Sequence, residues 1–319
     1  MLLKVISIII SSTAKTGVPL FLMISGALLI PKKETIRDLM LKRVLRILII
    51  LTGASFVYYI RLYILHPEYG FSLKYFFYMI HGQPFITPFW FLYTYTAFLI
   101  ILPFIRRMAL GMTKTEYDYL ILLCLIFGFF MFFVNKLFGI DNYLKIPVFS
   151  TGLIYPLIGY YVDAVFDPNK LTSIFGKIIP FNHGKYVAIA VSLILVNGIA
   201  CAGLTYNDFL STGEWTYKYI ESMTFIPAFC IFYIIRTIFI MNPLSNISSR
   251  IISYIGSCSF TMYLLEEMLR EDICMNIYTA WAGHCPNLIL FIPYALSIYI
   301  LGITIASLLK LIPGINKLL

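Results

Sequence analysis

The sequence predicts an all-α membrane protein, a polytopic bundle of about nine spanning helices. Two observations lead to this fold class. Of the 319 residues, 60% are hydrophobic and only 12% are charged, about half the charged fraction of soluble domains. Apolar runs of about 20 residues, the length that crosses a bilayer as a helix, recur along the whole chain. The net charge of +9 falls in short loops between these runs, where it orients helices and does not indicate nucleic-acid binding.

The apolar segments are expected to form a single domain, because no linker or low-complexity stretch divides the chain. In chain order the expected spans are residues 5–30, 44–65, 86–105, 118–138, 146–166, 186–204, 220–240, 251–269 and 288–309. Segment 71–80 is too short to span and is expected to lie along the membrane interface. The run PFWF from Pro88 marks the start of the third span at the outer face, where aromatic residues are common.

The charges of the loops predict the orientation of the chain. Basic loops alternate with neutral or acidic loops from the first span to the last. Basic loops are the cytoplasmic ones in membrane proteins, so these loops and the C-terminus are expected in the cytoplasm. The basic residues include Lys32, Lys33, Arg43, Arg106, Arg107, Lys114, Lys170, Lys177, Lys185, Arg236, Arg250, Lys310 and Lys317. Such a count places Met1 outside with Lys4 and Lys15, so we expect a further apolar helix to be encoded upstream.

The cysteines predict packing and no metal site, because none of their spacings is that of a metal motif. Those in or beside apolar segments are expected to pack as small apolar residues: Cys124, Cys201, Cys230 and Cys258. Cys274 and Cys285 share a loop, where the spacing is compatible with a disulfide or with two free thiols.

Two arginines at the start of the second span form the first candidate site. Arg43 and Arg46 are three residues apart, so on a helix their guanidinium groups lie on one face. Guanidinium groups bind phosphate oxygens through paired hydrogen bonds. The predicted topology puts both at the cytoplasmic end of the span, in reach of a cytosolic phosphate-bearing ligand. The alternative is that both arginines only extend to the membrane surface and orient the helix.

A polar stripe along residues 251–269 forms the second candidate site. Ser259, Tyr263, Glu266 and Arg270 recur at helical spacing on one face. An ionisable residue within a span is a functional candidate, and Glu266 is expected near the outer face as an acid or base, or as a substrate anchor. The alternative is a helix-end ion pair between Glu266 and Arg270, which are four residues apart in the favourable order.

The remaining local motifs indicate packing. Ser25 and Gly26, within LFLMISGALL, allow a close approach between two helices, and packing is the expected role. The sequence contains none of the GxSxG, HExxH, P-loop or GxGxxG motifs. From the residues alone, the chain is a multi-helix membrane protein with an inner anion site and an outer carboxylate.

Four segments in order, VPLFLMISGALL, KRVLRI, FWFLYTYTAFLIILP and SCSFTMYLLEEMLR, resemble the acyltransferase-3 family over nearly the whole chain. The resemblance implies a membrane enzyme that moves an acyl group, usually acetyl from acetyl-CoA, to an extracytoplasmic glycan or another envelope or secreted acceptor. It also implies a plasma-membrane location, with the lipid bilayer and a hydroxyl-bearing acceptor as partners.

The resemblance also implies residue roles. Arg43 and Arg46 match the family's RxxR motif, implicated in handling acyl-CoA. Phe21–Gly26 matches its FFxxSG-like segment, with Leu22 in place of the second Phe. Tyr263 matches the tyrosine of a GIYLxH-like segment, in which Glu266 stands at the His position, so Glu266 and Tyr263 are the candidate catalytic residues. The family has ten helices, and its first carries a catalytic histidine; the nine spans map onto the second to the tenth, so the expected upstream helix is also expected to carry that histidine.

Two other functions are compatible with the same residues. In a transporter or flippase, the arginines and Glu266 would line a substrate path, but such proteins often contain inverted repeats and no internal repeat is evident here. An inactive truncated homologue is the other alternative, if the first helix is absent.

Overall fold

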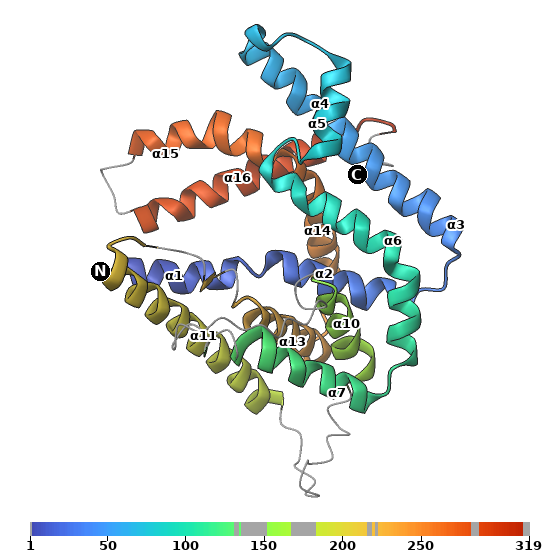
Figure 1. Cartoon of the computed structure of the whole chain (residues 1–319), viewed down its shortest axis with the longest axis vertical. Helices are drawn as coiled ribbons and strands as arrows, with labels where there is room; N and C mark the ends of the chain where they lie inside the picture. Colours follow the sequence, from blue (N-terminus) through green and yellow to red (C-terminus); the bar gives the residue numbers. More distant parts are fainter. Residues whose placement is uncertain are drawn as a thin grey trace, which may run out of the picture. The chain divides into compact units, whose positions relative to one another are not determined.

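The computed structural model describes residues 2–130, 134, 152–166, 183–215, 219–220, 223–281 and 287–314 (Figure 1). Every regular element in these residues is a helix, which confirms the predicted all-α class. The chain forms two compact units, each made of two stretches of sequence. Unit 1 comprises Met1–Lys33 and Leu102–Pro243, and unit 2 comprises Glu34–Ile101 and Leu244–Leu319.

Five helical stretches of the described residues are long and apolar enough to span a membrane, and each matches a predicted span. They are Leu3–Leu29, Ile36–Leu65, Thr87–Gly111, Gly184–Thr212 and Leu290–Leu309. Predicted span 220–240 corresponds to the apolar helix Phe225–Met241, which has 17 residues. Predicted span 251–269 corresponds to the less apolar helix Asn246–Met268, which has 23 residues. Predicted spans 118–138 and 146–166 extend into residues outside the described part. The total of nine therefore stays a prediction.

Unit 1 is built from α-helices and two π-helical turns. Its elements are α1 (Leu2–Ala14), α2 (Gly17–Leu29), the second half of α6 (Trp90–Gly111), α7 (Lys114–Leu123), η4 (Cys124–Phe130), α10 (Ile154–Tyr160), η5 (Tyr161–Val165), α11 (His183–Thr212) and α13 (Phe225–Met241). Helix α1 packs along α11, and α2 packs along α10 and α13 (Figure 1). Helix α7 begins with a capping box, in which Thr113 caps the helix and donates hydrogen bonds to Glu116. These bonds hold the pKa of the Glu116 carboxyl below its usual value.

Helices α2 and α10 meet backbone to backbone. A Cβ atom added at Gly26 would lie 2.0 Å from the backbone oxygen of Pro156, and one added at Gly159 would lie 2.0 Å from the backbone oxygen of Met23. Only glycine allows this approach at both positions, and the neighbouring Ser25 is buried. The predicted packing role of the Ser25–Gly26 pair is confirmed.

The contact between α1 and α11 encloses a small apolar core around Ile8, Cys201 and Met223. The side-chain amide of Asn197 donates to the Met223 backbone oxygen at 3.2 Å and joins this core to the start of α13. The predicted packing role of four cysteines is confirmed, because all are buried as free thiols: Cys124, Cys201, Cys230 and Cys258. The question of a Cys274–Cys285 disulfide lies outside the described residues, which do not include Cys285.

Unit 2 has as its elements α3 (Ile36–Leu39), η1 (Met40–Val44), α4 (Leu45–Leu65), η2 (Pro67–Tyr69), α5 (Leu73–Gly82), η3 (Thr87–Phe89), the first half of α6 (Trp90–Gly111), α14 (Asn246–Met268), η7 (Leu269–Cys274), α15 (Met275–Trp281) and α16 (Asn287–Leu309). Segment 71–80, predicted to be too short to span, lies largely in the ten-residue helix α5, and its place along the membrane interface stays a prediction. The predicted start of a helix at Pro88 is confirmed by η3 and α6. Helices α14 and α16 pack closely at Gly302, against Met262.

Candidate functional site

The late tyrosine of the polar stripe is fixed to the start of α6. The Tyr263 hydroxyl donates a hydrogen bond to the backbone oxygen of Pro88. Its ring contacts Phe89 and Phe91, with ring centroids 6.4 and 6.1 Å away. Pro88 lies in the 3₁₀ turn η3 that precedes α6, so the stripe on α14 lies against the start of the aromatic third span.

Glu266, one turn after Tyr263 on α14, is half-buried. Among the residues that the structure describes, its side chain makes neither a hydrogen bond nor an ion pair. A half-buried carboxylate without a partner loses hydration without compensation, so it is suited to accept a proton or a hydrogen bond from a ligand.

The alternative of a helix-end ion pair between Glu266 and Arg270 is not what the structure contains. Arg270 instead donates to Glu267 at 2.5 Å, and its distance to Glu271 is 3.7 Å. Arg270 lies in the π-helical turn η7, where the backbone bonds follow i→i+5 spacing. The i, i+4 rule on which the expected pair depended applies to an α-helix, so it fails at this position.

The charges around Glu266 form a chain of ion pairs between α4 and η7. Arg61 on α4 reaches Glu271 at 3.4 Å, and Arg270 joins Glu271 to Glu267. Glu267 and Glu271 therefore each have a basic partner, whereas Glu266 has none within ion-pair distance among the described side chains.

Tyr58, a residue that the sequence reasoning missed, sets the geometry of this helix end. Its hydroxyl donates to the Leu264 backbone oxygen at 3.1 Å and accepts from the Met268 backbone N–H at 3.3 Å. These two groups would bond to each other in an unbroken α-helix. The Tyr58 side chain, which is buried, thus inserts into the helix ladder immediately before η7. Its own position in an apolar run gives no sign of this role.

We expect Tyr58→Phe to lower the melting temperature of the protein. The substitution removes two hydrogen bonds in a buried place, at a cost of about 1–3 kcal/mol. The measurement is thermal unfolding of the detergent-solubilised protein, with size-exclusion chromatography as the readout of the folded fraction after heating. Tyr63→Phe on the same helix is the matched control, because the Tyr63 side chain is exposed. If both variants melt at the wild-type temperature, the Tyr58 hydroxyl does not stabilise the end of α14.

The arginines predicted at the inner end of the second span lie at the junction of η1 and α4. Arg43 is in the π-helical turn η1, and its Nε atom is 3.1 Å from both carboxylate oxygens of Glu34. Arg46 follows on α4 and is exposed. Turns of this kind are frequent at functional sites. Glu34, nine residues before Arg43, could not be found from helical spacing, because the chain bends between them.

The pair of Arg43 with Glu34 decides how an anion would bind here. The side chain of Arg43 is 27% exposed and that of Glu34 is 13% exposed, so the guanidinium group is already held in place before any ligand arrives. A guanidinium group held in this way loses little freedom when an anion binds, whereas the Glu34 carboxylate repels phosphate. Phosphate binding by Arg43 and Arg46 stays a prediction.

Comparison with known proteins bears on the whole chain. The model of the acyltransferase-3 family, described as an acyltransferase domain, matches residues 2–311. No curated relative and no solved structure matches the chain. With its apolar helices and a match over nearly its full length, the chain is a multi-pass membrane protein that belongs to the acyltransferase-3 family.

Proposed function

We propose that this protein transfers an acyl group, most simply acetyl, from cytosolic acyl-CoA to a hydroxyl group of an extracytoplasmic glycan or another cell-envelope acceptor. The observation that carries the proposal is the family match over residues 2–311, which supports an acyltransferase. Acetyl-CoA, the glycan acceptor and a plasma-membrane location are the specific parts of the proposal. They come from the family resemblance and the loop charges.

The donor is proposed to bind at Arg43 and Arg46. Coenzyme A carries several phosphate groups, and guanidinium groups are their natural partners. The loop charges put this end of α4 in the cytoplasm, where acyl-CoA is present. Glu34 has two opposing effects, because it positions the Arg43 side chain and also repels the phosphates.

The acceptor is proposed to meet Glu266. The carboxylate takes the proton of the acceptor hydroxyl as its oxygen attacks the thioester carbonyl. The C–S bond then breaks, the coenzyme A thiolate leaves, and it takes up the proton from Glu266, which restores the carboxylate and gives the free thiol. Tyr263, fixed to Pro88, keeps this part of α14 in place. Glu266 stands where the family motif has a histidine, and both side chains can accept a proton.

Glu266→Gln is expected to lower acyl transfer by about 100-fold or more, the usual contribution of a general base. The assay uses purified protein in liposomes, labelled acetyl-CoA and a panel of hydroxyl-bearing glycans, with transfer of label as the readout. Glu68→Gln is the control, because it changes an exposed carboxylate of another loop. If Glu266→Gln and wild type transfer label equally, Glu266 is not the base. If no variant and no acceptor gives transfer, the proposed function fails.

A further inference from the structure

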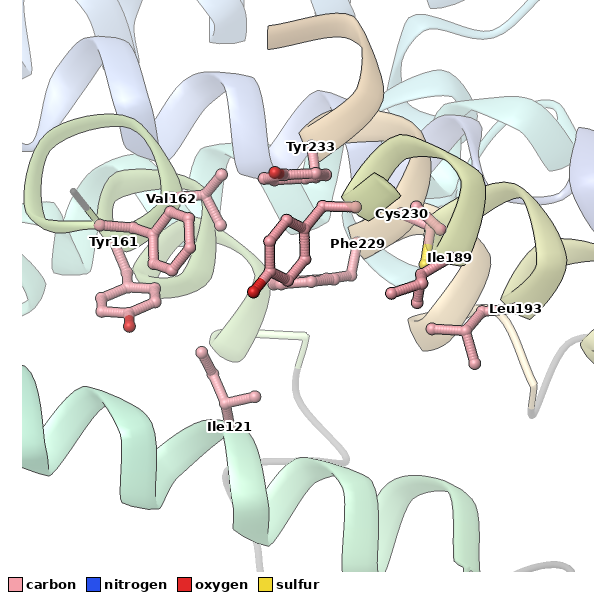
Figure 2. A pocket seen from close by; sticks show the side chains of 11 residues that line it. Ile121, Tyr161, Val162, Ile189, Leu193, Phe229, Cys230 and Tyr233 are labelled. Carbon is pink, nitrogen blue, oxygen red and sulfur yellow. The ribbon is translucent and has the colours of Figure 1, made fainter. Parts of the chain in front are cut away.

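Unit 1 contains a cavity of about 220 Å³ between α7, η5, α11 and α13 (Figure 2). Its walls are almost entirely hydrocarbon. The side chains that matter for the argument are Ile121, Val162, Ile189, Leu193, Phe229 and Cys230. In Figure 2, Ile189 and Leu193 stand on one flank of the cavity, and Tyr161 and Val162 stand on the other. Tyr161, Tyr186 and Tyr233 also line the cavity, but little of its wall is polar, so it offers a ligand mainly hydrocarbon contacts.

The cavity opens toward the surface that faces lipid. Ile189 and Leu193, both in its lining, are 45% and 44% exposed. They belong to Gly184–Thr212, one of the stretches long and apolar enough to span a membrane. The exposed apolar side of a spanning helix is in contact with lipid chains, so hydrocarbon is what lies at the opening.

Two ion pairs adjoin the lining residues Tyr161 and Val162. Arg236 Nε is 3.2 Å from Asp163 Oδ1, two residues beyond the lining residue Tyr161. The Tyr161 hydroxyl donates to Asp118 at 2.5 Å, and Lys114 pairs with the same carboxylate at 2.7 Å. Two basic and two acidic groups therefore lie beside the same hydrocarbon-walled space.

These polar groups mark an interfacial depth in the membrane. Lys114 begins α7, Asp163 is in the last turn before Phe166, and Arg236 is near the end of α13. Helix ends lie near the headgroups of a bilayer, whereas the middle of a span lies in hydrocarbon. The loop charges assign this depth to the cytoplasmic leaflet.

We infer that the cavity binds one hydrocarbon chain of a zwitterionic phospholipid, whose headgroup lies against the Asp163–Arg236 and Lys114–Asp118 pairs. The phosphate group of the lipid contacts the two cations, Lys114 and Arg236. Its ammonium group contacts the two carboxylates, Asp118 and Asp163. By proportion to a 150 Å³ apolar cavity that binds benzene, the space holds about eight or nine carbon atoms of the chain. The inference does not depend on the proposed acyl transfer.

The test places the full chain in nanodiscs with a phosphatidylethanolamine that carries a photoactivatable diazirine in its acyl chain. Labelled peptides are mapped by mass spectrometry. We expect labelling to concentrate on Ile189, Leu193 and Phe229. An excess of unlabelled phosphatidylethanolamine should remove it, and the same excess of phosphatidylglycerol should remove much less. Ile199 is 62% exposed on the same helix, so its labelling reports ordinary contact with the bilayer. This labelling should fall only in proportion to the dilution of the photoactivatable lipid, whichever unlabelled lipid is added.

Two variants fill the cavity independently, Ala190→Leu and Cys230→Phe, from residues that line it. Each should reduce cavity labelling to background and leave labelling at Ile199 unchanged. A third variant, Arg236→Ala, should abolish the preference between the two lipids. Competition on the wild-type protein needs no variant, so failure of the filled proteins to fold leaves the test intact.

Three results would overturn the inference. If labelling in the cavity falls on dilution by the same factor as labelling at Ile199, the cavity residues make only ordinary contact with the bilayer. Equal competition by both lipids would remove the headgroup assignment. Displacement by octanoyl-CoA, but not by phosphatidylethanolamine, would assign the cavity to an acyl chain of the donor.

Discussion

Gly26→Ala and Gly159→Ala are each expected to destabilise the protein strongly, by more than about 3 kcal/mol, above the usual cost of an overpacked core. The reason is geometric. The new methyl group at either position would lie 2.0 Å from a backbone oxygen of the facing helix. A backbone oxygen cannot rotate away as a side chain can, so α2 and α10 have to separate. Their separation would break the principal packing contact between the two stretches of unit 1.

Thermal unfolding in detergent, followed by size-exclusion chromatography, measures this effect. Gly203→Ala is the matched control, because Gly203 lies in helix α11 of the same unit and an added Cβ atom there meets nothing within 4 Å. The control is expected to melt at or slightly above the wild-type temperature, since alanine favours the helix. Wild-type melting of Gly26→Ala would show that the two helices do not touch at this point.

Arg43→Ala and Arg46→Ala are expected to weaken acyl-CoA binding by about 10- to 150-fold each. Each variant loses a charge-assisted contact worth about 1.5–3 kcal/mol. Arg43→Lys should recover only part of the affinity, because lysine lacks the planar fork of donors. Glu34→Gln should tighten binding, because it removes the negative charge held 3.1 Å from Arg43 Nε.

Isothermal titration of detergent-solubilised protein with acetyl-CoA measures these affinities. Arg250→Ala is the control for charge alone, because Arg250 is exposed in the first turns of α14, on the same predicted side of the membrane. Unchanged affinity in both Arg43→Ala and Arg46→Ala would leave these arginines with only an orienting role at the membrane surface.

Sequence patterns were sufficient for the features that depend on local order. The apolar runs predicted the class and the five long helices, because burial in lipid requires a continuous apolar helix. The Ser25–Gly26 pair predicted a close helix contact, because small residues have few other uses within a span. Its partner residues, Pro156 and Gly159, could not be found, since pairing between distant helices leaves no local pattern.

The arrangement around Glu266 shows where sequence reasoning fails. Helical spacing offered an ion pair with Arg270 as one of two interpretations of Glu266, but the Tyr58 hydroxyl bonds to the backbone of α14 and a π-helical turn follows. Tyr58 lies more than 200 residues earlier in the chain, at a sequence separation of 206 from Leu264. The failure came from assuming an ideal helix at its last turn, where long-range contacts decide the geometry.

The most direct test of the proposed function is the side of the membrane on which acyl-CoA is consumed. Acyl-CoA does not cross a bilayer, so labelled acetyl-CoA is added outside vesicles that contain the protein and enclose a glycan acceptor. The account predicts that inside-out vesicles, with Arg43 and Arg46 facing the added donor, transfer label to the enclosed glycan, and that right-side-out vesicles do not. Transfer by right-side-out vesicles alone would contradict the proposed side of the donor site. The absence of transfer in both preparations, with every acceptor, would contradict the proposed function.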